Sequence, residues 1–153
     1  MLSREEIARR IPHQGRMCLL ERVVAWTPEG IRCEATSHSL PDNPLRAHGR
    51  LGIACGIEYA AQAMAVHGSL VAPPAGLPQA GYLASVRGVQ WHASRLDDVA
   101  GPLSVNAERL MGDGNNIVYS FEVTCERGPL LSGRATVVLD AALAAAIGAG
   151  ARP

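Results

Sequence analysis

The chain has 153 residues, and its 14 basic side chains, all of them arginine, balance 14 acidic ones, so its formal net charge is zero. This length suits one domain with a buried core. No segment gathers basic side chains into the patch or stripe that would bind a nucleic acid or an anionic membrane, so we expect neither as a partner.

The amino-terminal stretch MLSREEIARR mixes acidic and basic residues and has no continuous apolar core, unlike a secretory signal or a membrane anchor. The longest weakly charged run, residues 51–80, is interrupted by Gly68, Pro73 and Pro74. We therefore expect a cytoplasmic protein without a membrane span.

The four cysteines form no Cys-x-x-Cys pair, which argues against a zinc site and a disulfide framework. They are Cys18, Cys33, Cys55 and Cys125. Since free cysteine behaves as a small apolar side chain, we expect them mainly in the core. No pair of histidines has the spacing of a metal site, so we expect neither a metal nor a cofactor.

The first half of the chain predicts a short helix, a hairpin and a long helix. Ser3 and Glu6 have the spacing of a capping box, which predicts a helix over residues 3–11. Extended segments at 17–26 and 30–37 are joined by the turn TPEG. A Pro- and Gly-containing loop over 41–52 then precedes an apolar, alanine-rich segment, which predicts a helix over 53–69 that is buried nearly all round.

The second half predicts strands. After the break VAPPAGLPQAG, alternating or β-branched segments predict strands over 82–92, 102–111, 116–126 and 130–140. Tight turns such as GDGNN favour antiparallel pairing. We expect one domain over residues 1–140 and an Ala/Gly-rich tail over 141–153.

Together these elements predict an α+β protein in which a curled antiparallel sheet of five to six strands wraps one long central helix. This is the hot-dog fold. Because such a sheet has exposed edges and leaves the helix half covered, we expect a dimer whose protomers pair edge to edge.

Glu58 is the single acidic residue of the predicted central helix, and Gln62 lies one turn further along the same face. An ionised carboxylate is costly in apolar surroundings, so a chain that keeps one there generally uses it, here as a proton donor. The alternative is a solvated side chain that complements the helix dipole in the first turns.

A base that titrates near neutral pH would complete an acid–base pair, and histidine is the usual choice. His48 is the first candidate, because it lies on the loop before the helix and faces the helix start from its own chain or across a dimer axis. For His13 a structural role is favoured over a place at the pocket. Structural or surface roles are also favoured for the remaining three histidines, His38, His67 and His92.

Two segments carry a resemblance to a known family. IPHQGRMCLLERVVAW has a Pro-His pair, a small loop and a Leu-rich strand, and HGRLGIACGIEYAAQAMA has a Gly-rich loop followed by Gly56, Glu58, Ala61 and Gln62. In these motifs the chain resembles hot-dog 3-hydroxyacyl-acyl-carrier-protein dehydratases, in particular those associated with aryl-polyene lipid clusters. The resemblance covers about residues 3–140.

The resemblance implies dehydration of a 3-hydroxyacyl thioester on acyl carrier protein to the 2-enoyl thioester. A histidine, here His48, would remove the proton beside the thioester carbonyl, and Glu58 would protonate the departing hydroxyl. Backbone N–H groups at the helix start would stabilise the enolate-like oxygen. The expected substrate-binding residues are Gly56, Cys55, Gln62, Arg50 and His13.

The loop before the helix departs from the family's usual His-x-Pro-Gly sequence, since it reads RAHGRLGIACG. Two alternatives to dehydration therefore stay open. The first alternative is an acyl thioesterase in which Glu58 activates water. The second is a non-catalytic hot-dog subunit that pairs with an active dehydratase. The expected assembly is accordingly a homodimer or a hot-dog heterodimer.

Overall fold

Six strands form a single antiparallel sheet in which most neighbours in sequence are also neighbours in space. The computed structural model describes residues 1–71, 81–113 and 115–139, and its strand order is β1-β2-β4-β5-β6-β3. The strands are β1 (Arg22–Thr27), β2 (Gly30–Ala35), β3 (Gly81–Trp91), β4 (Leu103–Gly112), β5 (Asn116–Cys125) and β6 (Gly128–Leu139). The predicted hairpin and all four later strands are confirmed, and the predicted tail at 141–153 lies outside the described residues.

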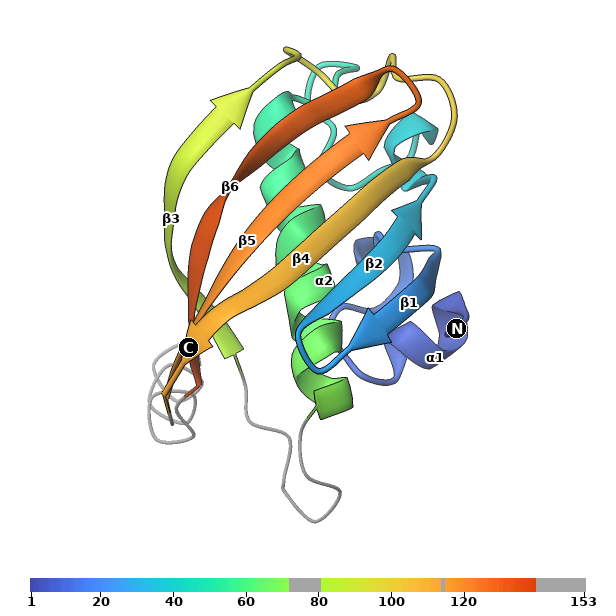
Figure 1. Cartoon of the computed structure of the whole chain (residues 1–153). Helices are drawn as coiled ribbons and strands as arrows, with labels where there is room; N and C mark the ends of the chain where they lie inside the picture. The colour runs from blue at the N-terminus through green and yellow to red at the C-terminus, as the bar shows by residue number, and fades with distance from the viewer. Residues whose placement is uncertain (72–80, 114, 140–153) are drawn as a thin grey trace, which may run out of the picture.

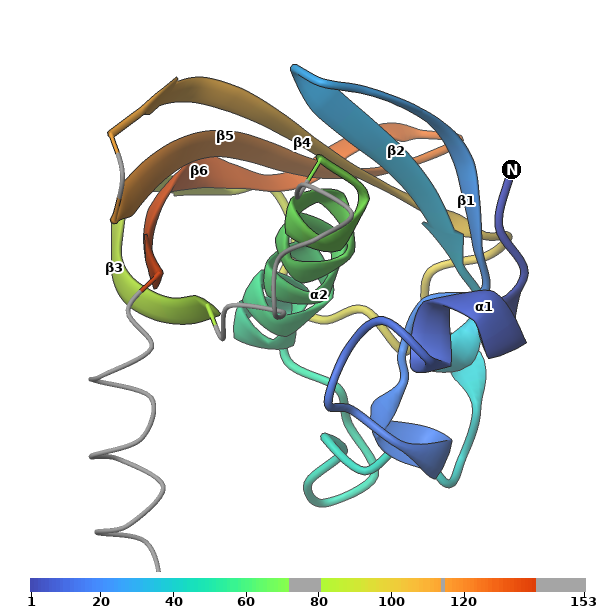
Figure 2. The same cartoon turned by 90° about the horizontal axis from the view of Figure 1, so that it is seen from below.

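The helix α2 (Gly56–Val71) lies along the concave side of the sheet, preceded by a 3₁₀ turn at Ile53–Cys55. The sheet curves around α2 without closing (Figures 1 and 2). This is the predicted hot-dog architecture, and it places one end of α2 beside the amino-terminal segment, which folds back under β1 and β2 (Figure 2).

The core forms where alternating residues of the strands meet α2. Along β5, for example, Ile117, Tyr119, Phe121 and Val123 are buried, and the residues between them are exposed or half-buried. This two-residue period puts one face of the sheet on the helix and the other in solvent. Each fully buried aliphatic side chain stabilises the fold by about 1.5–3 kcal/mol relative to an exposed one.

The prediction that α2 is buried nearly all round is wrong for one of its faces. Ala65 is exposed, and Ile57, Glu58 and Ala61 are half-buried, whereas Tyr59 on the opposite face is fully buried. The sheet covers only its own side of the helix, so small and apolar residues near the start of α2 stay accessible in a single chain.

The amino-terminal segment begins with the helix α1 (Arg4–Ala8), whose Ser3 and Glu6 form the predicted capping box. The helix ends three residues earlier than predicted. The strand predicted from residue 17 begins only at Arg22. Residues 17–20 do not join the sheet: a 3₁₀ turn at Gly15–Met17 leads into them, and the side chain of Gln62 hydrogen-bonds the backbone of Met17 and Leu19.

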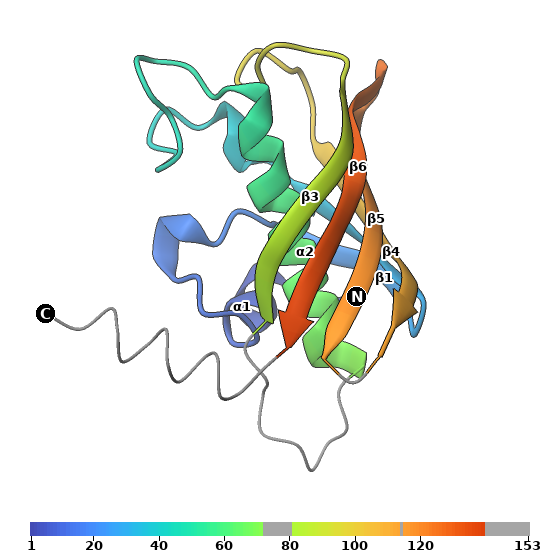
Figure 3. The same cartoon turned by 90° about the vertical axis from the view of Figure 1, so that its left-hand side faces the viewer.

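The two edges of the sheet differ. The outer edge of β1 is bridged by Leu2, which pairs with Val23, whereas β3 at the other edge pairs only with β6 among the described residues. Figure 3 shows β3 as the outermost strand on its side. Within the described ranges, the chain has no helix long and apolar enough to cross a membrane.

Candidate active site

Glu58 lies in the first turn of α2, and its carboxylate is held by two nitrogen atoms. Its Oε1 lies 3.0 Å from Nε2 of His13 and 3.2 Å from Nε2 of Gln62. The side chain of Glu58 is 34% exposed in the single chain. The carboxylate is therefore neither bathed in bulk solvent nor fully enclosed, and it faces an imidazole.

His13 reaches Glu58 from the loop after α1. Its side chain is 28% exposed, and its second ring nitrogen, Nδ1, is buried without a hydrogen-bond partner in the described part of the chain. The contact joins residues 45 positions apart in sequence. From the residues alone a structural role was favoured for His13, and the family resemblance added it to the substrate-binding residues; the fold brings this histidine to the carboxylate of the helix.

The loop that carries His13 is tied to the rest of the chain on both sides. Gln14 donates through Nε2 to the carbonyl of Ala8 at 3.0 Å, and Arg4 donates to the carbonyl of Gly15 at 3.1 Å. Gly15 has φ = +58°, a conformation that glycine adopts without the steric penalty of a side chain. These contacts fix the path of the chain before and after His13, and so the position of the imidazole.

His48 lies elsewhere, at the tip of an exposed turn. Ala47 and Arg50 exchange two backbone hydrogen bonds, of 2.9 and 3.0 Å, and both residues between them, His48 and Gly49, have positive φ. No hydrogen bond or ion pair joins His48 to Glu58 within the described chain. The imidazole that meets Glu58 in the same chain is that of His13. Arg50 is also exposed on this turn.

His38 and His67 are both fully buried. His67 Nε2 donates to the carbonyl of Thr27 at 2.8 Å, so its Nδ1 accepts from the hydroxyl of Tyr119, also at 2.8 Å. His38 Nε2 donates to the carbonyl of Val99 at 3.1 Å. Burial lowers the pKa of both imidazoles, because desolvation disfavours the charged form. Both contribute to packing rather than to the site, as expected.

The segment before β4 contacts the chain just before α2 through Arg95 and Asp97. Asp97 accepts the backbone N–H of Leu51 at 2.9 Å and forms an ion pair with Arg95. The Arg95 guanidinium holds the pKa of the Asp97 carboxyl well below its usual range. These contacts hold the backbone at Leu51, five residues before α2, against the segment that precedes β4.

Gly56 and Cys55, which were expected to bind substrate, lie at this helix start. Gly56 is buried, and a Cβ atom at this position would lie 2.2 Å from Cδ2 of Leu131. Its observed role is therefore the close approach of α2 to β6. Cys55 is half-buried, and its thiol lies 3.9 Å from the carbonyl of Leu45.

The cysteines are free in the structure. Cys18 and Cys33 are buried, as expected of core residues, whereas Cys55 and Cys125 are half-buried. Burial raises the pKa of Cys33 to about 12, so this thiol stays protonated and unreactive at neutral pH. Across the described residues, no cluster of three or more His, Cys, Asp and Glu side chains is arranged to hold a metal ion.

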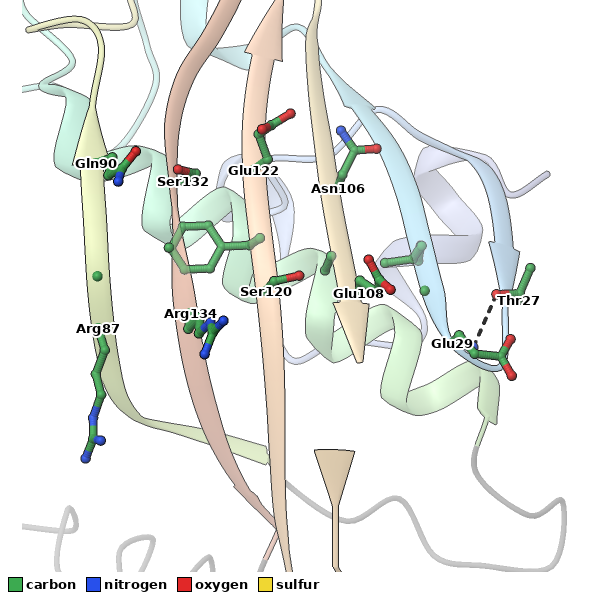
Figure 4. Close-up of a pocket in the computed structure, with 16 residues that line it drawn as sticks. Thr27, Glu29, Arg87, Gln90, Asn106, Glu108, Ser120, Glu122, Ser132 and Arg134 are labelled. Atoms are coloured by element: carbon green, nitrogen blue, oxygen red, sulfur yellow. Dashed lines mark hydrogen bonds between the residues drawn. The ribbon is translucent and has the colours of Figure 1, made fainter. Parts of the chain in front are cut away.

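A broad concavity lies over the solvent side of the sheet, away from Glu58 and His13. Figure 4 shows polar side chains of the strands lining it, among them Asn106, Ser120, Glu122, Ser132 and Arg134. These residues alternate with the buried positions that face α2. This is the ordinary polar surface of a half-covered antiparallel sheet, and neither His13 nor Glu58 lines it.

The sequence model of one protein family, described as ApeP-like: ApeP dehydratase, matches residues 5–147. The chain belongs to this dehydratase family. The match includes both halves of the His13–Glu58 pair. No curated protein sequence matches the chain.

Solved structures show the same fold. The chain is similar to the dehydratase heterocomplex ApeI:P from Xenorhabdus doucetiae, with a TM-score of 0.76 and 23% identity over 88% of this chain and 90% of that one. It is also similar to a thioesterase from Haemophilus influenzae, with a TM-score of 0.58 and 12% identity over 78% and 77% of the two chains. A hypothetical thioesterase from Streptococcus pneumoniae, solved with coenzyme A, has a TM-score of 0.58 and 11% identity over 78% and 84%. These likenesses establish the hot-dog fold of this dehydratase family member.

Proposed function

We propose that the chain removes water from a 3-hydroxyacyl thioester carried on acyl carrier protein, in aryl polyene biosynthesis, with His13 as base and Glu58 as acid. The observation that carries the proposal is the 3.0 Å contact between the His13 imidazole and the Glu58 carboxylate. Membership of a dehydratase family supports the reaction type.

The pair supplies a complete proton cycle. Neutral His13 takes the proton from the carbon beside the thioester carbonyl, and protonated Glu58 gives its proton to the 3-hydroxyl as the carbon–oxygen bond breaks. The products are the 2-enoyl thioester, one water, an imidazolium and a carboxylate. Both side chains are partly exposed, so the imidazolium then releases its proton to solvent, Glu58 takes one up, and the resting state is restored.

We further propose that a second hot-dog chain, either a copy of this one or a homologue, covers the open side of the site. The half-exposed face of α2 supports this assembly, as does the outer edge of β3, which pairs with no strand of residues 1–71, 81–113 and 115–139. The related dehydratase structure is a heterocomplex. A partner there would exclude water and strengthen the electrostatic interactions of the pair.

The test measures formation of the enoyl thioester and release of free thiol from 3-hydroxyacyl acyl carrier protein, by mass spectrometry and a thiol-reactive dye. Glu58→Gln and His13→Gln each keep a hydrogen-bonding side chain but remove proton transfer, and we expect each to lower kcat by about 10²–10⁴-fold. The double variant should be little worse than either single one, because the two residues act as a unit.

His48→Gln is the matched control, since it changes an imidazole on the exposed turn. We expect it to keep kcat within about twofold, a change of less than about 0.5 kcal/mol in the barrier. The proposal is wrong if both Glu58→Gln and His13→Gln keep full activity, or if His48→Gln alone abolishes it. Release of thiol without dehydration would instead identify a thioesterase. Absence of turnover in the chain, alone and with any hot-dog chain that co-purifies, would identify a non-catalytic subunit.

A further inference from the structure

Gln62 is fully buried, and both N–H groups of its side-chain amide donate hydrogen bonds. Its Nε2 donates to the carbonyl of Met17 at 2.7 Å and to Glu58 Oε1 at 3.2 Å, and its Oε1 accepts the backbone N–H of Leu19 at 2.9 Å. An amide group has two N–H hydrogens, and both are engaged here.

The orientation of this amide is fixed by its backbone partners. The N–H of Leu19 can only donate and the carbonyl of Met17 can only accept, so the oxygen must face the first and the nitrogen the second. A flipped amide would place like groups against each other at both positions. Gln62 therefore meets Glu58 with a hydrogen and never with a lone pair.

The same amide connects both halves of the proposed acid–base pair. It donates to Glu58 from one turn along the helix, and it holds the chain at Met17 and Leu19, a few residues after His13. Gln62 therefore contacts the carboxylate directly and the segment after His13 through its backbone.

Gln62 also distinguishes the two oxygens of Glu58. Oε1 lies 3.0 Å from the His13 nitrogen and accepts a hydrogen bond from the Gln62 nitrogen at 3.2 Å. In the described chain no hydrogen bond or ion pair engages Oε2. Oε2 is therefore the oxygen left to meet a substrate hydroxyl.

We propose that Gln62 is a positioning residue for the dehydration, which sets the plane of the Glu58 carboxylate so that Oε2 faces the substrate and Oε1 faces His13. This inference rests on the proposed function. Loss of such orientation typically lowers the rate by up to about 100-fold without changing the reacting groups.

The first test is Gln62→Met, which keeps the shape of the side chain and removes its three hydrogen bonds. We expect kcat to fall about 10- to 100-fold with KM changed by less than about threefold, because the loss is in orientation rather than in substrate binding. The ¹⁵N chemical shifts of the His13 imidazole should also change in the free protein, since the contact with Glu58 is loosened. That readout does not require turnover.

The second test is Gln62→Glu, whose neutral acid form still donates one hydrogen and accepts from Leu19. Because position 62 is fully buried, desolvation raises the pKa of the introduced acid. We expect kcat of this variant, relative to the original chain, to fall as the pH rises above that pKa and the donor is lost, and to level off near the loss expected for Gln62→Met, about 10- to 100-fold. Assays between pH 6.5 and 8.5, with circular dichroism at each pH, restrict the comparison to folded protein.

Tyr59→Phe is the matched control on the same helix. Tyr59 is fully buried and its hydroxyl bonds Ser37 and Asn43 rather than the pair. It should lower stability but keep kcat and its pH profile. The inference is overturned if Gln62→Met keeps the original kcat and the His13 shifts while Glu58→Gln and His13→Gln are inactive. Full activity of those last two variants would instead overturn the proposed function itself.

Discussion

Acidification below about pH 6.5 should destabilise the folded chain through His38 and His67. Both imidazoles are fully buried, and burial lowers the pKa of each from its ordinary value of 6.5. Between the native and unfolded pKa values, the unfolded chain binds a proton that the native chain does not. The stabilisation is therefore complete above pH 6.5, falls as the pH drops below it, and levels off below the native pKa values.

The magnitude follows from the number of protons. One proton difference changes the free energy of unfolding by about 1.4 kcal/mol per pH unit, so two buried imidazoles give a slope of up to about 2.7 kcal/mol per pH unit. The carboxyls of Glu6, Asp97 and Asp113 have lowered pKa values, so their stabilisation is lost only as the pH falls below about 4.5. They do not add to the slope between pH 6.5 and 5.

Urea unfolding at pH 7.5, 6.5, 6.0, 5.5 and 5.0 measures this slope. His67→Gln keeps a donor for the carbonyl of Thr27 and should halve the slope, to about 1.4 kcal/mol per pH unit, and His38→Gln should do the same. The reasoning would be refuted by a flat profile between pH 6.5 and 5, or by an unchanged slope in both variants.

Two further substitutions test packing around the site. Gly56→Ala places a methyl group 2.2 Å from Cδ2 of Leu131, and overpacking of this kind should lower the free energy of unfolding by about 1–3 kcal/mol, as measured by urea unfolding. A second substitution in the same chain, Leu131→Val, removes the clashing methyl group and should recover part of this loss. Tyr59→Phe removes the hydroxyl that donates to Ser37 and accepts from Asn43, which should lower the free energy of unfolding by about 1–2 kcal/mol. An unchanged melting temperature would show that these buried hydrogen bonds contribute nothing to stability.

The sequence alone was sufficient to predict the architecture. The spacing of Ser3 and Glu6, the apolar helix that begins near residue 53 and the alternating segments after residue 81 are local patterns, and each gave an element that the structure contains. Glu58 was also found from the sequence, because a single acid in an apolar helix is conspicuous without any knowledge of its neighbours. Local periodicity carries this information, since it reflects which face of an element is buried.

The partner of that acid was decided only by the tertiary structure. The sequence favoured His48, ten positions before Glu58, but the structure places His48 on an exposed turn and brings His13 to 3.0 Å from the carboxylate. The sequence signal available was the Pro-His motif of the amino-terminal segment, which does not say where that loop folds.

The boundary of the first strand was missed for a related reason. Residues 17–20 have the composition of a strand, but their backbone partner is the side chain of Gln62, 43 positions away from Leu19. Composition predicts which secondary structure a segment favours. The hydrogen-bond partner of a backbone group, however, depends on which distant residues fold against it. The sequence of this chain therefore determined its elements and drew attention to Glu58, and the packing of the amino-terminal loop on α2 determined that His13 contacts this carboxylate.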